Sequence, residues 1–343
     1  MKKYYFNPDK KFTAVEEKNT ILKKSQIRIK MKNCGICGSD IHYYLFGENG
    51  GRKIIEPLML GHEFSGEIIE IGSKVNNFKV GERIIVNPAL YCGECKFCKL
   101  KKFNLCENVS FFGSAAKVPH TQGAFRENIE INETQCYKIF DSVSYEEAAF
   151  AEPLAVSLHA CSFLNEYKNK KILISGSGPI GLLIFKILLK YTKNENIFLA
   201  DINNNVLNGA KKLGSSNIIN VYDSSNFTKD YNNFFDIAFE SSGNVNSINN
   251  IIKVINKGGM VIQVGNMPGG LLGIEYNQMM LKELKFFGSY RFGKEFREAV
   301  DLINKKAFSF EDMLTHSFKL EECEEAMKVA SNKDISIKVQ VYN

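Results

Sequence analysis

Tryptophan is absent from this sequence of 343 residues, while lysine, asparagine and isoleucine are abundant, which we interpret as compositional bias. No apolar run reaches the roughly eighteen residues that a membrane-spanning helix needs. The first residues, Met1 to Asn7, include two lysines but neither an apolar core nor a small-residue cleavage site, so we expect no secretory signal. The sequence also has no internal repeat and no low-complexity linker. These absences argue against an exported protein and against one that spans a membrane.

The bulk composition is that of a soluble, folded protein, with 44 % apolar and 24 % charged residues. A chain of this length can form two domains of ordinary size, each with its own core. The net charge of +6 comes from single lysines scattered among acidic residues. We therefore expect it to aid solubility and to attract small anionic ligands, and we expect no nucleic-acid partner. Nine cysteines without an export signal favour a reducing, cytoplasmic location.

The most informative feature that is present is a group of four cysteines: Cys92, Cys95, Cys98 and Cys106. Two-residue spacers between the first three cysteines and a longer segment before Cys106 can bring four thiolates together around a tetrahedral Zn²⁺ ion. A pair of disulfides is the alternative, and it fits poorly with a chain that carries no export signal. The spacing therefore predicts a structural zinc lobe over about residues 87–110. Because such a site is closed, the chemistry must lie elsewhere in the chain.

The chain has two regions that differ in their pattern of apolar residues. Up to about residue 150, short apolar runs are broken by glycines, which is typical of a β-rich, partly closed barrel. From about Glu152 onwards, helix-length patterns alternate with short apolar strands, which indicates βαβ units and a parallel sheet. The tail returns to helix and loop and ends in a strand-like run. We therefore predict an α/β domain over residues 152–289, inserted into a β-rich domain of residues 1–151 and 290–343.

A glycine-rich turn opens the predicted α/β domain. The run Gly176-Ser177-Gly178-Pro179-Ile180-Gly181 follows an apolar strand, begins a helix and precedes a second strand that ends in Asp201. In this context the three glycines allow the tight turn, the approach of a pyrophosphate and close helix packing. Asp201 would accept hydrogen bonds from the ribose hydroxyls and repel a 2′-phosphate, so we predict NAD, with NADP as the open alternative. The plainer alternatives are a turn without a ligand and a solvated helix cap at Asp201.

Two short motifs in the first domain carry the remaining chemistry. Cys37, Ser39 and His42 supply a thiol, a hydroxyl and an imidazole within six positions. Gly61-His62-Glu63 supplies a second imidazole and a carboxylate, and Glu152 adds another carboxylate at the domain junction. One cysteine, one histidine and one or two carboxylates can form a zinc site with an open position, as catalysis requires.

Several of these residues have plainer alternatives. Cys34 is interpreted as structural, because Cys37 begins the better motif. The alternative for Glu63 is a place outside the ligand shell, and the alternative for His42 is a buried structural role. The remaining histidines (His120, His159 and His316) are expected to be non-catalytic, and the cysteines at 136, 161 and 323 are expected to be small buried side chains.

With these residues in place, the chain resembles the zinc-dependent medium-chain dehydrogenases along essentially its full length. The matching runs occur in the order of that family: CGSDxH at 37–42, GHE at 61–63, the four cysteines, EPL at 152–154 and GxGxxG at 176–181. It is most similar to the branch that oxidises polyols and sugar acids, on the runs at 42–44, 151–154 and 288–292. Further runs at 111–120, 151–160 and 288–292 favour the members that act on the sugar acid L-idonate.

The resemblance implies a β-rich GroES-like catalytic domain with an inserted Rossmann domain, and a homodimer or homotetramer. It implies a catalytic zinc on Cys37, His62 and Glu63, with Glu152 close by or reaching the metal through water. It also implies a proton relay through Ser39 and His42. Together with the four-cysteine lobe, these expectations predict two zinc ions per chain.

The expected substrate is L-idonate, oxidised at C5 to 5-keto-D-gluconate, and the alternative is a neutral polyol such as sorbitol or xylitol. Tyr43 is expected to bond substrate hydroxyls and Arg291 to bind the carboxylate, with Lys117 and Arg126 as further candidate cations. A remote alternative is a non-catalytic nucleotide-binding protein, because a fold does not fix a function. The intact set of reactive residues argues against that alternative.

Overall fold

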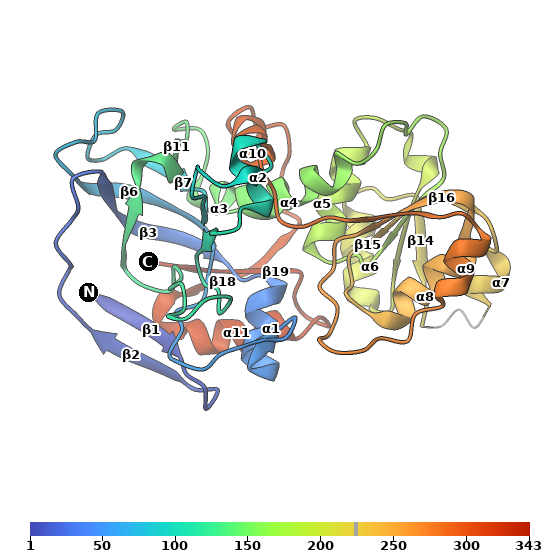
Figure 1. Ribbon diagram of the computed structural model, residues 1–343, viewed down its shortest axis with the longest axis horizontal. Coiled ribbons are helices and arrows are strands. Elements are labelled where there is room, and N and C mark those ends of the chain that lie inside the picture. Colours follow the sequence, from blue (N-terminus) through green and yellow to red (C-terminus); the bar gives the residue numbers. More distant parts are fainter. Residues whose placement is uncertain (223–225) are drawn as a thin grey trace. The chain divides into compact units, whose positions relative to one another are not determined.

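The computed structural model describes residues 1–222 and 226–343, and the chain divides into two compact units (Figure 1). The expected domain limits lie within a few residues of the borders of these units, except that residues 333–337, which the sequence placed in the first domain, lie in the second unit. Unit 1 comprises Met1–Ala155, Gly293–Asn332 and Lys338–Asn343, and unit 2 comprises Val156–Phe292 and Lys333–Ile337.

The main sheet of unit 1 has seven strands in the order β11-β7-β6-β3-β19-β18, with β10 also paired with β3. Neighbouring strands are antiparallel except β18 and β19. The C-terminal strand β19 thus lies beside β3 from the N-terminal part of the chain (Figure 1). The strands are β3 (Gln26–Gly35), β6 (Glu63–Ile71), β7 (Arg83–Val86), β10 (Asn128–Asn132), β11 (Cys136–Lys138), β18 (Leu314–Lys319) and β19 (Lys338–Tyr342).

Three pairs of short strands and several helices complete unit 1. The pairs are β1 (Lys2–Phe6) with β2 (Phe12–Glu16), β4 (Glu48–Asn49) with β5 (Arg52–Lys53), and β8 (Ala89–Leu90) with β9 (Ser110–Phe111). The helices are α1 (Gly38–Phe46), α2 (Lys96–Lys99), α3 (Tyr145–Ala148), α10 (Glu295–Asn304) and α11 (Cys323–Ser331), with 3-10 turns η1 (Phe103–Leu105), η2 (Glu133–Gln135) and η4 (Leu320–Glu322). The helix α4 (Ala151–Cys161) begins in unit 1 and ends in unit 2.

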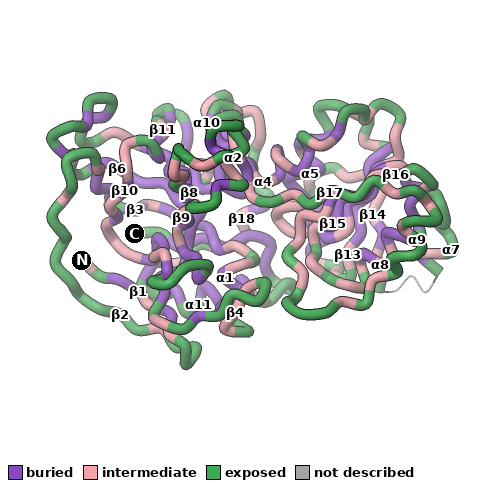
Figure 2. The backbone as a smooth tube through the Cα atoms, viewed as in Figure 1, coloured by how far each residue is buried: buried purple, intermediate pink, exposed green. Residues whose placement is uncertain are grey.

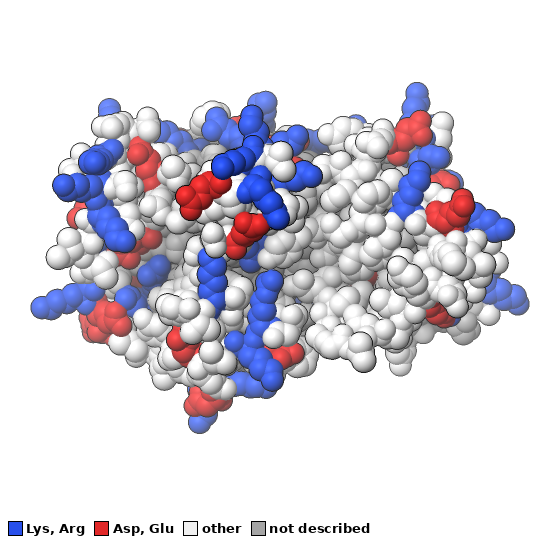
Figure 3. Space-filling model, viewed as in Figure 1, with Lys and Arg blue, Asp and Glu red and all other residues white. Residues whose placement is uncertain are grey.

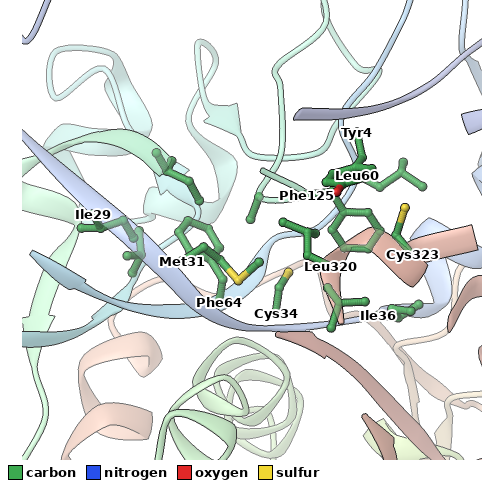
Figure 4. Close-up of a cluster of buried hydrophobic side chains, with 14 of the residues drawn as sticks. Tyr4, Ile29, Met31, Cys34, Ile36, Leu60, Phe64, Phe125, Leu320 and Cys323 are labelled. Atoms are coloured by element: carbon green, nitrogen blue, oxygen red, sulfur yellow. The ribbon is translucent and has the colours of Figure 1, made fainter. Parts of the chain in front are cut away.

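The core of unit 1 fixes the segment that enters α1. Apolar side chains from β3 and β6, among them Met31 and Phe64, join Leu320 and Cys323 in one buried cluster (Figure 4). A fully buried aromatic side chain such as Phe64 contributes about 1.5–3 kcal/mol. The same cluster contains Cys34 and Ile36. It therefore holds the backbone firmly just before Cys37, and Cys34 is a buried core residue, as expected.

Unit 2 is a Rossmann domain, as the sequence predicted. Its six strands are all parallel and follow the order β14-β13-β12-β15-β16-β17. The strand order reverses between β12 and β15, which is where such sheets bind ligands at their carboxyl ends. The strands are β12 (Ile172–Ser175), β13 (Ile197–Asp201), β14 (Asn217–Asn220), β15 (Phe235–Glu240), β16 (Ile255–Gln263) and β17 (Lys285–Gly288).

The strands at the centre of this sheet are mostly apolar and buried because helices cover them. Ile172 to Ile174 of β12 are fully buried, as are most residues of β15. Figure 2 shows the buried and exposed stretches along the chain. The helices are α5 (Pro179–Leu188), α6 (Asn204–Lys212), α7 (Phe227–Asp230), α8 (Val245–Val254) and α9 (Tyr276–Leu281), with the 3-10 turn η3 (Asn194–Asn196). Among the helices of residues 1–222 and 226–343, none combines the length and apolar character that crossing a membrane would require.

Candidate active site

The first part of the site is the start of α1. Cys37 caps this helix, and the Asp40 carboxylate accepts a hydrogen bond of 2.9 Å from the Cys37 backbone N–H. The other Asp40 oxygen accepts one of 3.2 Å from the Gly61 N–H and lies 3.8 Å from Nδ1 of His62. Asp40 is fully buried. It therefore ties the segment that carries Cys37 to the segment that carries His62.

The structure adds Asp40 to the surroundings of Cys37 and His62, although the sequence analysis assigned it no role inside the run from Cys37 to His42. At 3.8 Å, Oδ1 of Asp40 is too far from Nδ1 of His62 for a hydrogen bond, so Asp40 acts on the His62 ring through its charge. The ring of His62 also packs against Phe111, with 5.5 Å between the ring centroids. The signal available in the sequence was the acidic residue three positions after a helix cap.

The structure brings together Cys37, His62 and Glu63, whose ligand atoms lie within 4.8 Å of one another. Sulfur, imidazole nitrogen and carboxylate oxygen are donors that zinc accepts in a three-residue site with an open position. Nδ1 of the buried His62 has no hydrogen-bond partner among the described residues. A buried polar atom without a partner is costly unless another group binds it. The donor set therefore fits a zinc ion.

Glu152 is not part of this group of three, but it lies close enough to interact with it electrostatically. Burial raises the pKa of Glu152 to about 8; His62 opposes this effect, while Glu63 and Cys37 add to it. Burial likewise raises the pKa of the Cys37 thiol to about 11, with further contributions from Glu63 and Asp40. Several acidic groups thus crowd one buried space, and a divalent cation would relieve their repulsion.

Lys338, in the last strand β19, is the cation of this cluster and was missed from the sequence. It is 2 % exposed, its ammonium pairs with Oε2 of Glu63, and it donates a hydrogen bond of 3.0 Å to the Ile36 carbonyl. Burial opposes its charge, but Glu63 and Cys37 outweigh that cost, so the pKa of Lys338 is raised. A lysine within an apolar strand was the only signal, and it did not reveal the partner.

The pKa of Glu152 predicts how the stability of the metal-free protein depends on pH. Glu152 keeps its proton in the folded chain up to a pH of about 8, while its usual value is 4.5. The folded state therefore binds one more proton than the unfolded state between these values. The free energy of unfolding should fall as the pH rises through this window, by up to about 1.4 kcal/mol per pH unit from this group.

Denaturant titrations of the metal-free protein between about pH 5.5 and 7.5 measure this slope. The Glu152→Gln variant cannot release a proton, so its slope should be smaller. Glu146→Gln, on the exposed side of α3, is the matched control and should keep the wild-type slope. Identical slopes in the wild type and in Glu152→Gln would show that Glu152 ionises normally.

Helix α1 also presents the other candidate residues. The Ser39 hydroxyl hydrogen-bonds the Cys37 thiol and helps to lower its pKa against the effect of burial. His42 lies one turn further along, and its ring contacts Phe46. Tyr43 is buried, and its hydroxyl accepts a hydrogen bond of 3.1 Å from the Ala115 N–H. The helix thus supports Ser39, His42 and Tyr43 within one turn of each other.

The four-cysteine lobe is a second cluster that could hold a metal ion. The ligand atoms of Cys92, Cys95, Cys98 and Cys106 lie within 4.8 Å of one another, and all four thiols are free. The backbone N–H groups of Cys98 and Glu107 lower the pKa of Cys95 to about 6. The Cys95 thiolate is thus ready to bind a metal, whereas burial raises the pKa of Cys98 to about 12, so this thiol would lose its proton when the metal binds. The sulfur donors fit a closed tetrahedral zinc site, and the disulfide alternative does not describe this structure.

The glycine-rich turn has the geometry that the sequence predicted. Gly176 has φ of 95°, and a β-carbon at Gly181 would lie 2.0 Å from the Gly176 carbonyl oxygen, so side chains are excluded from both positions. Gly178 faces open space and caps α5, with Pro179 and Ile180 in the first turn. An anion can therefore approach the backbone at the N-terminus of this helix.

Asp201 ends β13, beside the glycine-rich turn. Its carboxylate accepts hydrogen bonds of 2.7 Å from the Ser177 N–H and 2.9 Å from the Asn203 N–H. These bonds hold the side chain at the carboxyl end of the sheet. Each carboxylate oxygen can accept a further hydrogen bond. Asn203 itself caps α6 through its bond with the Val206 N–H.

The candidate cations for a substrate carboxylate differ in their surroundings. Arg126 is not available, because it is largely buried and pairs with Glu130. Lys117 is exposed and donates to the Asn108 carbonyl. Arg291 lies in unit 2 with a φ of 54°, and its guanidinium sits 5.0 Å from the centre of the Tyr290 ring.

The other histidines and cysteines take structural positions. His120 is buried: Nε2 accepts from the Ile55 N–H, and Nδ1 hydrogen-bonds the Lys117 carbonyl. His316 stacks on Phe318, and His159 packs against Phe163. The three cysteines expected to be small buried side chains, at 136, 161 and 323, are buried.

Comparison with known proteins gives full-length matches. The alcohol dehydrogenase GroES-like domain matches residues 23–141, and the zinc-binding dehydrogenase domain matches residues 179–305. L-idonate 5-dehydrogenase (NAD(P)(+)) of Escherichia coli is 33 % identical over 97 % of this chain and 96 % of its own length. Sorbitol dehydrogenase of Bacillus subtilis is 32 % identical over 92 % of this chain and 90 % of its own. The crystal structure of the E. coli L-idonate 5-dehydrogenase matches 100 % of this chain and 98 % of that one, with a TM-score of 0.91 and 30 % identity.

Proposed function

This chain belongs to the zinc-dependent medium-chain dehydrogenases of the alcohol and polyol type, and from this premise we propose that it oxidises L-idonate at C5 to 5-keto-D-gluconate, with NAD as the acceptor. The observation that carries the chemistry is the buried group of Cys37, His62 and Glu63, which fits a zinc ion. The identity with the E. coli enzyme supports the sugar acid. The nearly equal identity with sorbitol dehydrogenase supports the runner-up, a neutral polyol.

The residues of unit 1 have separate tasks in this proposal. Cys37, His62 and Glu63 would hold the zinc, with Glu152 beside it. A zinc ion there supplies a Lewis acid that lowers the pKa of an alcohol. The Ser39 hydroxyl accepts the alcohol proton, and His42 passes it to solvent. A nicotinamide ring bound to unit 2 would accept the C–H hydrogen with its electron pair as a hydride. The alcohol would thus lose one hydride and one proton and become a ketone.

The dinucleotide is proposed to be NAD because of Asp201. Its carboxylate stands at the end of β13, and the next residues in the chain, Ile202 to Asn205, include no cation that could bind a 2′-phosphate. Asp201→Ala should therefore raise kcat/KM for NADP relative to NAD by about tenfold or more, because a charge repulsion is removed. Steady-state kinetics with both dinucleotides measure the ratio. A wild-type enzyme whose kcat/KM for NADP equals or exceeds that for NAD would contradict the assignment.

The substrate is tested with a panel of L-idonate, sorbitol and xylitol, each with both dinucleotides. L-idonate should give the highest kcat/KM. Arg291→Ala should then raise KM for L-idonate by about tenfold or more, since a hydrogen bond to a charged group contributes about 1.5–3 kcal/mol. It should change KM for sorbitol far less. Lys193→Ala, which removes an exposed cation of the same unit, is the matched control.

Equal losses for both substrates would make Arg291 a general polyol contact. A wild-type preference for sorbitol or xylitol would replace the sugar acid by the runner-up. If none of the three is oxidised with either dinucleotide by zinc-loaded protein, the proposed substrate class is wrong.

We also propose that the protein is a homodimer or homotetramer. Large apolar side chains are exposed on α9 and β17 of unit 2, among them Tyr276, Met280, Leu281 and Phe286. β17 is the last strand of its sheet, and an edge strand can pair with its copy across a twofold axis. Light scattering measures the mass of the assembly, and the mass of one chain would contradict this proposal.

The cellular location and partners are proposed on chemical grounds. All nine cysteines are free thiols, which suits a reducing compartment such as the cytoplasm. Lysine and arginine are interspersed with acidic side chains over the face that Figure 3 shows. This pattern supports a small-molecule substrate over a nucleic acid. Fractionation of cells with an antibody to the chain tests the location, and recovery outside the cytoplasm would contradict it.

A further inference from the structure

Glu240 is a buried carboxylate of unit 2 with no role in the site described so far. It is the last residue of β15 and has no exposed surface. Within the part of the chain that the structure describes, no lysine or arginine forms an ion pair with it. A buried charge without a counter-ion must be stabilised by hydrogen-bond donors.

Glu240 has four such donors, two on each carboxylate oxygen. Oε1 accepts from the Ser242 N–H, at 3.0 Å, and from the Ser242 hydroxyl. Oε2 accepts from the Gly243 N–H, at 3.1 Å, and from the Gln263 side-chain amide, at 2.6 Å. The backbone carbonyl of Glu240 accepts two more bonds, from Val264 and Gly265. One residue thus joins the loop after β15 to the loop after β16.

The loop after β15 also forms a wall of the glycine-rich turn. The Ser241 hydroxyl donates a hydrogen bond of 2.7 Å to the Gly176 carbonyl. A β-carbon at Gly176 would lie 2.6 Å from the Ser242 backbone nitrogen. Ser175 and Glu240 are paired residues of β12 and β15, the two strands between which the order of the sheet reverses. The loop that Glu240 holds therefore borders the turn where the pyrophosphate is expected.

We propose that Glu240 is a positioning residue for dinucleotide binding: it holds Ser241 and Ser242 against Gly176 and so fixes the shape of the turn that receives the pyrophosphate. This inference rests on the proposed binding of NAD at this turn. Glu240 touches neither the dinucleotide nor the substrate in this role. It acts through the backbone of the loop.

A carboxylate is needed at this position because all four groups that face its two oxygens are hydrogen-bond donors, so both oxygens must accept. A glutamine of the same shape would replace one oxygen by an NH₂ group. That group would point its hydrogens either at the two donors of Ser242 or at those of Gly243 and Gln263. Gln263 cannot simply reverse its amide, because the same NH₂ group also donates to the Gly265 carbonyl, at 2.8 Å. The loop should therefore move away from Gly176.

The test is a fluorescence titration of NADH into the full-length, zinc-loaded enzyme. Glu240→Gln should raise the Kd of NADH by about tenfold or more, and the KM for NAD by a similar factor, while kcat at saturating NAD changes little. Zinc content should stay at the wild-type value. Glu195→Gln, whose side chain is exposed in the same unit, is the matched control and should bind NADH like the wild type.

Ser241→Ala is a second variant, which removes the hydroxyl that donates to the Gly176 and Ser175 carbonyls and leaves Glu240 in place. It decides the question if Glu240→Gln does not fold. It should raise the Kd of NADH by about threefold or more. Wild-type Kd values in the folded Glu240→Gln variant, or in Ser241→Ala if that one alone folds, would overturn the inference. A fall in kcat with an unchanged KM for NAD would also overturn it. A wild-type enzyme that binds neither NADH nor NADPH would instead contradict the proposed function.

Discussion

His62→Ala is expected to lower kcat/KM by at least about a thousandfold, because a Lewis acid contributes several kcal/mol to the transition state and a thousandfold corresponds to about 4 kcal/mol. His62 is buried beside Cys37 and Glu63, and no other described histidine belongs to that group. The variant should contain one zinc equivalent fewer than the wild type. Its fold should persist, because the core of β3, β6 and α11 is unchanged.

Turnover assays, metal analysis and circular dichroism together measure this result. His316→Ala is the matched control, since His316 lies in the same unit, stacks on Phe318 and is not part of either cysteine-containing cluster among the described residues. The control should keep the wild-type activity and zinc content. A His62→Ala enzyme that retains both its zinc and its turnover would show that the reactive centre is elsewhere.

Cys95→Ser is expected to have the largest effect on stability. Structural zinc contributes about 10–16 kcal/mol of apparent binding free energy in small zinc domains, and this energy stabilises the loop that binds it. Loss of one of four ligands should lower the free energy of unfolding by about 4 kcal/mol or more, in the range that follows the loss of a metal site. The lobe also has little apolar core of its own, since Leu100 and Leu105 are exposed.

Metal analysis and denaturant unfolding check this prediction. The variant should lose one zinc equivalent and keep the second. Cys136→Ala is the control: Cys136 is a buried cysteine of unit 1 outside the cluster, and its removal should leave the zinc content unchanged. One zinc ion per chain in fully active wild-type protein would contradict the two-site prediction.

Local motifs were predictable from the sequence. The cysteine spacing and the glycine-rich turn each lie within about fifteen residues, so sequence distance limits where their atoms can lie. Asp201 was also predictable, because a strand of the parallel sheet must end beside that turn. The alternation of apolar strands and helices was enough for the Rossmann fold of unit 2.

Contacts between distant segments were not predictable in the same way. Lys338 meets Glu63 only because β19 pairs with β3 and β3 pairs with β6. Nothing near Lys338 in the sequence indicates this register. Arg126 is a different case, because its partner Glu130 lies only four residues along the chain; what the sequence did not reveal was that Arg126 is largely buried. Predicting which charged groups are buried or paired inside a core thus requires the three-dimensional structure.

The pairing of β19 with β3 has a consequence for the order in which the protein is made. β3, β6 and the four-cysteine lobe leave the ribosome first, and residues Val156–Phe292 of unit 2 follow before β18 and β19. Until then the stretch of β3 from Asn33 to Gly35, directly before Cys37, has an open backbone edge where β19 will pair. The inserted unit can fold before β19 pairs with this edge of β3. Only when β19 pairs with β3 does its Lys338 reach the buried acidic residues around Cys37.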